Sequence, residues 1–187
     1  MVSDRILLTL SSFKASGYMA SSADVLVVDD RLVEAQTALV AFERVAPRAS
    51  VLHLVDGGKA LEYLFSTGSF AARASKMPQL VFLSLEMETV SGLCVLDLMR
   101  AHPLTCQIPI VAVSLERNAR TYRRYTQLDA DAYVSLPCDF SRYCAVIEGC
   151  VERWLPWALR SHEPLSLPYS ARARREHGMV PMGGTRA

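Results

Sequence analysis

Several oxygen-bearing side chains of this 187-residue chain stand directly after short apolar runs. Asp29 and Asp30 follow "VLVV", Ser84 closes "QLVFLS" and Ser114 closes "IPIVAVS". An adjacent acidic pair suits a hard divalent cation, which prefers oxygen ligands. Asp30 is also well placed to cap a following helix. A serine hydroxyl, by contrast, is a weak nucleophile unless a base activates it.

Five apolar runs predict the strands that would bring these side chains together. They are apolar almost throughout, as is typical of strands covered on both faces of a parallel sheet. Ligands of such open sheets bind at the carboxyl ends of the strands. We therefore expect an α/β fold, a doubly wound five-stranded parallel sheet with five helices. The strands are expected at 25–29, 50–55, 79–84, 108–114 and 132–136, and the helices at 32–45, 57–66, 91–102, 117–129 and 140–159.

The flanking segments differ in composition from this central part. Residues 1–23 are rich in Ser and Ala and are expected to be a flexible extension, and Met19 is a possible true start. Residues 160–187 contain prolines and a basic cluster and are expected to be a flexible basic tail. A single folded domain is expected between them, at 24–159. The connection 68–78 has room for a helical turn.

Composition excludes several classes of function. The 20 basic and 19 acidic residues nearly cancel, so no global field attracts nucleic acid or an anionic membrane. The five cysteines show neither metal-ligand nor disulfide spacing, and no apolar run is long enough to span a bilayer. A glycine-rich phosphate loop is also lacking. We expect a cytoplasmic protein that is not an enzyme.

Four motifs carry a resemblance to a known family. "VLVVDD", "LVFLSLEMETVSG", "IPIVAVS" and "DAYVSLP" resemble, in order and spacing, the receiver domain of two-component response regulators, the CheY-like, flavodoxin-like receiver fold, over about residues 24–155. "LHLVDGGKALEYLFSTGSF", "HPLTCQIPIVAVS" and "VERWLP" are further similar to the single-domain receivers that partner bacterial phytochromes.

The resemblance implies a set of site residues. Such receivers accept a phosphoryl group on a carboxylate, while an acidic pair binds Mg²⁺ and a lysine contacts the phosphoryl oxygens. A hydroxyl and an aromatic residue change position when the phosphoryl group is bound. Asp29 and Asp30 match the acidic pair, Ser114 the switch hydroxyl and Tyr133 the switch aromatic residue.

Three positions depart from the family pattern. Ser84 stands at the phosphoacceptor position, Leu136 at the position of the lysine, and Glu88 where a proline often follows the acceptor. A phosphoserine would be a stable ester rather than a labile acyl phosphate. Since a lysine without its carboxylate partner would be costly to bury, we interpret Ser84 and Leu136 as one matched change. The receiver is therefore expected to be degenerate, with no intact catalytic site.

The electrostatic repulsion between Asp29 and Asp30, the remaining acidic pair, must be offset in some way. Two carboxylates about 4 Å apart repel by about 1 kcal/mol in water and about 4 kcal/mol at an effective dielectric constant near 20. A cation on Asp30 with Glu86 as an extra ligand, a raised pKa, or an arginine such as Arg31 or Arg117 would each offset this repulsion. No cofactor is expected to be required, and weak Mg²⁺ binding stays an alternative.

Two surfaces are candidate interfaces. Arg117, Arg120 and Arg124 recur at helical spacing and form either a basic docking face or an ordinary solvated one. Trp154 and Trp157 flank Pro156, and a single core would not easily bury both, which favours a homodimer. The expected partner is a sensor histidine kinase, with a bacterial phytochrome as one candidate, or another response regulator.

Three hypotheses for function follow. The first is an atypical receiver in two-component (phosphorelay) signalling that cannot accept phosphate at the usual position and acts through protein–protein interaction. The second is a receiver still regulated by nonstandard phosphorylation at Ser84 or Glu86. The third is a flavodoxin-like enzyme or nucleic-acid adaptor, for which the four motifs leave little room.

Overall fold

A five-stranded, wholly parallel sheet forms the centre of the protein. The computed structural model describes residues 22–73, 76–114 and 128–159. The strand order is β2-β1-β3-β4-β5, so the order reverses beside β1. The strands lie within one or two residues of the expected positions and confirm the fold class: β1 (Val25–Val28), β2 (Val51–Leu54), β3 (Leu80–Ser84), β4 (Ile110–Ser114) and β5 (Ala132–Ser135).

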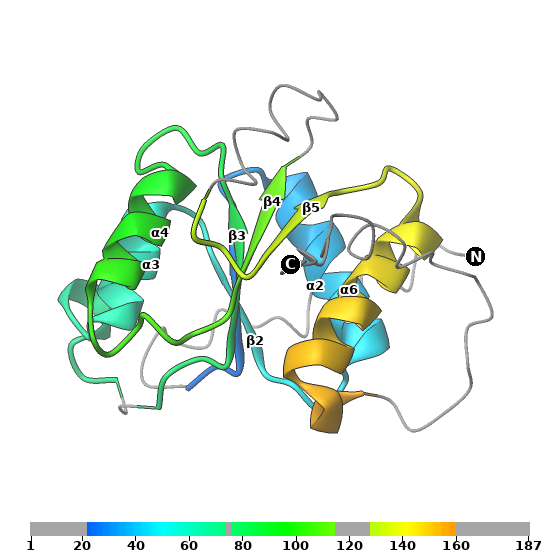
Figure 1. Ribbon diagram of the computed structural model, residues 1–187, viewed down its shortest axis with the longest axis horizontal. Coiled ribbons are helices and arrows are strands. Elements are labelled where there is room, and N and C mark those ends of the chain that lie inside the picture. Colours follow the sequence, from blue (N-terminus) through cyan, green and yellow to red (C-terminus); the bar gives the residue numbers. More distant parts are fainter. Residues whose placement is uncertain (1–21, 74–75, 115–127, 160–187) are drawn as a thin grey trace, which may run out of the picture.

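Helices cover both faces of the sheet. In Figure 1, α2 (Leu32–Val45) and α6 (Phe140–Trp154) lie on one side of the strands, and α3 (Gly57–Leu64) and α4 (Gly92–Ala101) lie on the other. A short 3₁₀ turn, η1 (Gly68–Phe70), occupies the connection where a helical turn had room. The helix expected at 117–129 falls almost wholly outside the described residues.

Alternate strand residues supply two separate cores. Val25 and Val27 of β1 pack toward α2 and α6, whereas Leu26 and Val28 pack toward α3 and α4, and all four are buried. Because side chains alternate across a strand, a sheet covered on both faces needs an apolar residue at nearly every position. This explains the uninterrupted apolar runs of the sequence.

Helix boundaries follow from local chemistry. Asp56, Ser91 and Asp139 accept hydrogen bonds from backbone amides in the first turns of α3, α4 and α6. Helix α2 has no side-chain cap, because the residue before it is Arg31. The interpretation of Asp30 as a helix cap is therefore wrong.

Helix α6 is shorter than expected from the sequence. It ends at Trp154 and is followed by the 3₁₀ turn η2 (Pro156–Ala158) rather than continuing to residue 159. Proline has no backbone N–H and cannot continue an α-helix, so Pro156 accounts for the break.

The packed part of the chain includes Ala23. This residue is buried, and its backbone N–H donates to the Tyr63 hydroxyl of α3 at 2.8 Å. Residues 1–21 and 160–187, which contain most of the expected extension and the whole of the expected tail, lie outside the described residues. Within the described ranges, every helix is too short or too polar to cross a membrane.

Candidate functional site

The residues singled out at the strand ends gather at one edge of the sheet. Strands β1 and β3 are neighbours, with Val28 opposite Leu83, and β3 and β4 are neighbours, with Ser84 opposite Val113. Asp29 therefore leaves β1 beside Ser84 of β3, as expected. Asp29 is only 4% exposed, and Ser84 and Ser114 are fully buried.

A glycine closes the loop that follows Ser84. A Cβ added to Gly92 at the start of α4 would overlap the backbone carbonyl oxygen of Ser84 and lie 2.8 Å from the Cα of Leu85. Only a residue without a side chain permits this approach. The backbone around Ser84 is thus held by direct packing against α4.

Arg31 fills the space between the acidic residue and the serine. Its Nε donates to Asp29 Oδ1 at 3.2 Å, and its Nη2 donates to Asp29 Oδ2 at 3.3 Å and to Ser84 Oγ at 3.2 Å. The backbone N–H of Arg31 also donates to Asp29 Oδ1 at 3.0 Å. Arg31 is one of the two arginines named among the three possible ways to offset the repulsion of the acidic pair, and it contacts Asp29. Arg117 lies outside the described residues.

The surroundings of Arg31 favour its charged form. Burial alone would lower the pKa of the guanidinium, but hydrogen bonds from it to Asp29 and the charges of Asp29, Glu34 and Glu86 together raise that pKa. The side chain of Arg31 is 29% exposed and that of Asp29 is 6% exposed, so the pair is only partly screened by water. The Arg31 guanidinium therefore carries its positive charge at neutral pH.

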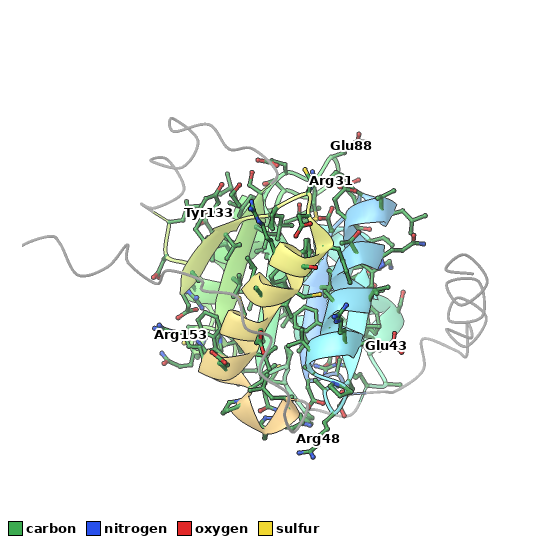
Figure 2. The ribbon with its side chains drawn as sticks, turned by 90° about the vertical axis from the view of Figure 1, so that its right-hand side faces the viewer. Arg31, Glu43, Arg48, Glu88, Tyr133 and Arg153 are labelled. Atoms are coloured by element: carbon green, nitrogen blue, oxygen red, sulfur yellow. The ribbon has the colours of Figure 1, made fainter. Side chains whose placement is uncertain are left out.

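The other two carboxylates also have partners within the chain. Asp30 Oδ2 accepts a hydrogen bond from the backbone N–H of Glu88 at 2.7 Å. Glu86 Oε1 accepts one from the Ser114 hydroxyl at 2.7 Å. Glu88 and Arg31 lie at the same edge of the molecule in Figure 2. Strand β4 is thereby tied to the loop after β3, and that loop to the end of β1.

The donor set does not fit the divalent cation that the fold family implies. A hard cation needs several oxygens that point toward one spot. Among the described residues, no three His, Cys, Asp or Glu side chains form a group that could hold a metal ion. Asp29, Asp30 and Glu86 instead direct their oxygens to Arg31, to a backbone amide and to Ser114.

Leu136 and Tyr133 take different positions around this edge. Leu136 is 3% exposed and packs in the core shared with α2 and α6, while its backbone N–H donates to the carbonyl oxygen of Ser114 at 3.0 Å. Tyr133 is half-buried on the opposite face, against Leu85 and Ala112. Figure 2 shows Tyr133 well to one side of Arg31.

Sequence reasoning missed two neighbours of Asp29. His53 of β2 makes a hydrogen bond through Nε2 to the backbone oxygen of Asp29 at 2.8 Å. Tyr143 of α6 is 4% exposed, and burial, followed by the charges of Asp29 and Glu34, raises the pKa of its phenol. Nothing in the sequence spacing of either residue indicates this relation to Asp29.

The candidate interface residues are only partly described. Arg117, Arg120 and Arg124 lie outside the described residues. Trp154, the last residue of α6, is half-buried against the core between the sheet and helices α2 and α6. The Arg153 guanidinium is 5.2 Å from its ring centre. Trp157 is 43% exposed, and its indole N–H donates to Gln79 Oε1 at 3.3 Å.

The comparisons with known proteins identify the family. The model of the response regulator receiver domain matches residues 25–148. This chain belongs to the response regulator receiver family. Its membership favours a receiver over a flavodoxin-like enzyme or a nucleic-acid adaptor.

Individual relatives point to the same class. The chain is similar to the bacteriophytochrome response regulator RtBRR, with 31% identity and a TM-score of 0.60 over 68% of this chain and 76% of that one. It is also similar to the bacteriophytochrome response regulator AtBRR, with 29% identity and a TM-score of 0.59 over 68% and 91%. These likenesses confirm the expected resemblance to regulators of bacterial phytochromes.

A curated relative is longer than this chain. Stress response regulator protein 1 of Meyerozyma guilliermondii is 29% identical over 115 residues, which are 62% of this chain but only 49% of that protein. The chain thus spans about half the length of this relative.

Proposed function

We propose that this chain is a receiver that signals by binding other proteins and does not accept phosphate at position 84. The observation that carries this proposal is the environment of Ser84. Its hydroxyl is fully buried, and its oxygen accepts a hydrogen bond from the positively charged Arg31. A hydroxyl becomes nucleophilic when a base removes its proton, whereas a neighbouring donor draws electron density from the oxygen.

Among the residues that the structure describes, the neighbours of Ser84 offer no base of this kind. Asp29, the acidic residue beside it, already accepts hydrogen bonds from Arg31 on both carboxylate oxygens. Leu136, at the position where the family has a lysine, places an apolar side chain in the core. A phosphoryl group on Ser84 would therefore have neither an activated acceptor nor the usual lysine beside it.

The direct test is phosphorylation by a small-molecule donor. The full chain would be incubated with Mg²⁺ and an acyl phosphate, and its intact mass measured at neutral pH. We expect no mass increase. A stoichiometric phosphate adduct that peptide mapping places on Ser84 would contradict the proposal, and an alkali-labile adduct on Glu86 would show phosphorylation by the nonstandard route.

A gain-of-function variant provides the control for this test. Ser84→Asp with Leu136→Lys restores the two groups that the family pattern contains. If this double variant accepts phosphate while the wild type does not, the two positions account for the difference. Adding Arg31→Met to an inert double variant would show whether the guanidinium obstructs the restored carboxylate.

For the partner, we propose a sensor histidine kinase of the phytochrome class in the cytoplasm, or another response regulator. The likeness to two bacteriophytochrome regulators supports the phytochrome class. Calorimetric titration of a bacterial phytochrome kinase with the full chain, in darkness and under red light, tests it. Binding in at least one state is expected, and heat changes indistinguishable from dilution in both would refute this choice.

We also propose a homodimer through the end of the domain that carries Trp157. This side chain is 43% exposed although indole is largely apolar, and exposed aromatic groups are frequent at interfaces. Sedimentation equilibrium over a wide concentration range is expected to show a dimer that Trp157→Ala weakens. A monomer mass at every concentration would rule this interface out.

A further inference from the structure

We propose that Arg31 is the resident cation of the acidic pocket, by which we mean the site formed by Asp29, Asp30 and Glu86, and closes it to divalent metal ions. The inference rests on the proposed function in one respect, because a pocket that transfers no phosphoryl group has no need of an exchangeable metal. It goes further by naming the group that has taken the place of the ion.

The geometry of Arg31 is that of a bound cation. Its guanidinium contacts both carboxylate oxygens of Asp29 and the hydroxyl oxygen of Ser84, at 3.2 to 3.3 Å. These atoms come from two neighbouring strands, β1 and β3. A single positive group therefore joins the two strand ends, which is the arrangement that a metal ion held between them would produce.

Competition between the guanidinium and a metal ion favours the guanidinium. Arg31 lies two residues from Asp29 in the chain, so its effective concentration at the carboxylate is high without any binding cost. A guanidinium is also weakly hydrated, whereas Mg²⁺ gives up its water reluctantly. A divalent ion would have to displace Arg31 before it could contact Asp29.

The remaining carboxylates do not provide a second place for the ion. Asp30 is engaged by the backbone N–H of Glu88 and Glu86 by the Ser114 hydroxyl, each at 2.7 Å. Metal binding there would compete with those contacts as well. Removing Arg31 alone, however, would leave Asp29 as a nearly buried carboxylate without its cation, and a small divalent ion could then relieve it.

Binding of Mn²⁺ to the full chain tests the proposal. The loss of the electron paramagnetic resonance signal of free Mn²⁺ would be followed in the wild type, in Arg31→Met and in Arg31→Met/Asp29→Asn. Arg31→Met is expected to bind Mn²⁺ at least about tenfold more tightly than the wild type, and the added Asp29→Asn to abolish that gain. The readout does not depend on phosphorylation.

The matched control is Arg44→Met. Arg44 is an exposed arginine in the last turn of α2, the helix that follows Arg31, so the change in net charge is identical but the pocket is untouched. This variant is expected to bind Mn²⁺ as the wild type does. A gain equal to that of Arg31→Met would show a general charge effect and overturn the proposal.

One further outcome would overturn it, namely that Arg31→Met binds Mn²⁺ no more tightly than the wild type. If circular dichroism shows that Arg31→Met is unfolded, Arg31→Gln replaces it. The wild type alone also remains informative, because a dissociation constant for Mn²⁺ below about 1 mM that Asp29→Asn weakens would refute a closed pocket. Such a result without a phosphate adduct would leave the proposed function intact.

Discussion

Strand β1 has a buried aspartate at each end, and the two are neutralised in different ways. Beyond its amino end, Asp24 accepts hydrogen bonds from the backbone N–H and hydroxyl of Ser50, at 2.9 and 2.7 Å, from Lys76 at 2.8 Å and from Gln79 at 3.1 Å. Beyond its carboxyl end, Asp29 accepts side-chain hydrogen bonds from Arg31 at 3.2 and 3.3 Å.

The difference lies in where the partners come from. Those of Asp24 belong to the chain before β2 and before β3, so the aspartate joins segments that are distant in sequence. The partner of Asp29 is two residues away, and the contact closes within one loop. The charge of Asp24 therefore supports the fold, whereas the charge of Asp29 is compensated locally. Stability at the carboxyl end should come from backbone packing instead.

The largest effect is expected from Gly92→Ala. The added Cβ would overlap the carbonyl oxygen of Ser84, and the backbone of β3 or α4 must move. We expect the free energy of unfolding, measured by urea denaturation, to fall by about 3 kcal/mol. Gly149→Ala in α6 is the control, because its Cβ meets nothing within 4 Å, and it should gain about 0.5 to 1 kcal/mol. A similar loss in both variants would contradict the packing argument.

The next largest effect is expected from Asp24→Asn. Every group that contacts the Asp24 carboxylate donates to it. The one hydroxyl among them, Ser50 Oγ, already accepts from the backbone N–H of Asp24, so the amide NH₂ of an asparagine would face a donor. We expect a loss of about 2 kcal/mol in the free energy of unfolding. A change within experimental error would show that the cluster does not hold the amino end together.

A smaller effect is expected from the matching change Asp29→Asn. The amide oxygen can still accept from Arg31, and the side chain of Arg31 can turn toward water because it is already 29% exposed. Losing one charge of the acidic pair also relieves repulsion. We expect a change below about 1 kcal/mol. A loss larger than that of Asp24→Asn would reverse the comparison between the two ends.

The smallest effect is a pH dependence at the amino end. Burial would raise the pKa of Asp24, but hydrogen bonds from Lys76 and Ser50 outweigh burial and lower that pKa below its ordinary value. A depressed carboxyl pKa stabilises the fold above the unfolded-state pKa of about 3.9, and the contribution is lost as the pH falls through the folded-state value. The stability difference between wild type and Asp24→Asn should be constant from about pH 7 to 5 and shrink below about pH 4. A difference that grows on acidification would refute the shift.

The sequence was sufficient to predict those parts of the structure that depend on a pattern repeated along the chain. A sheet that is covered on both faces requires apolar residues at nearly every strand position. The positions of the strands and their parallel arrangement could therefore be predicted. The cluster around Asp24 has no such pattern, since its partners at positions 50, 76 and 79 meet only in the folded chain. The hydrogen bond between Glu86 and Ser114 was missed for the same reason, and Glu86 was instead considered as a metal ligand.

The role of Arg31 could be predicted only in part. Its place next to the acidic pair made it a candidate, but the sequence could not choose among an arginine, a cation and a raised pKa, since all three relieve the same repulsion. The choice depends on side-chain direction, and only the structure supplies that.

The guanidinium beside Asp29 has a consequence for timing. A regulator whose charges arrive with a phosphoryl group and a metal ion can be set and reset within the lifetime of one molecule. Here the compensating charge is the side chain of Arg31, which is part of the polypeptide. Hydrolysis, which removes a phosphoryl group, cannot remove it. In the proposed function, the strength of the signal then depends on how many copies of this protein are present. The rates of its synthesis and degradation set how long the signal lasts.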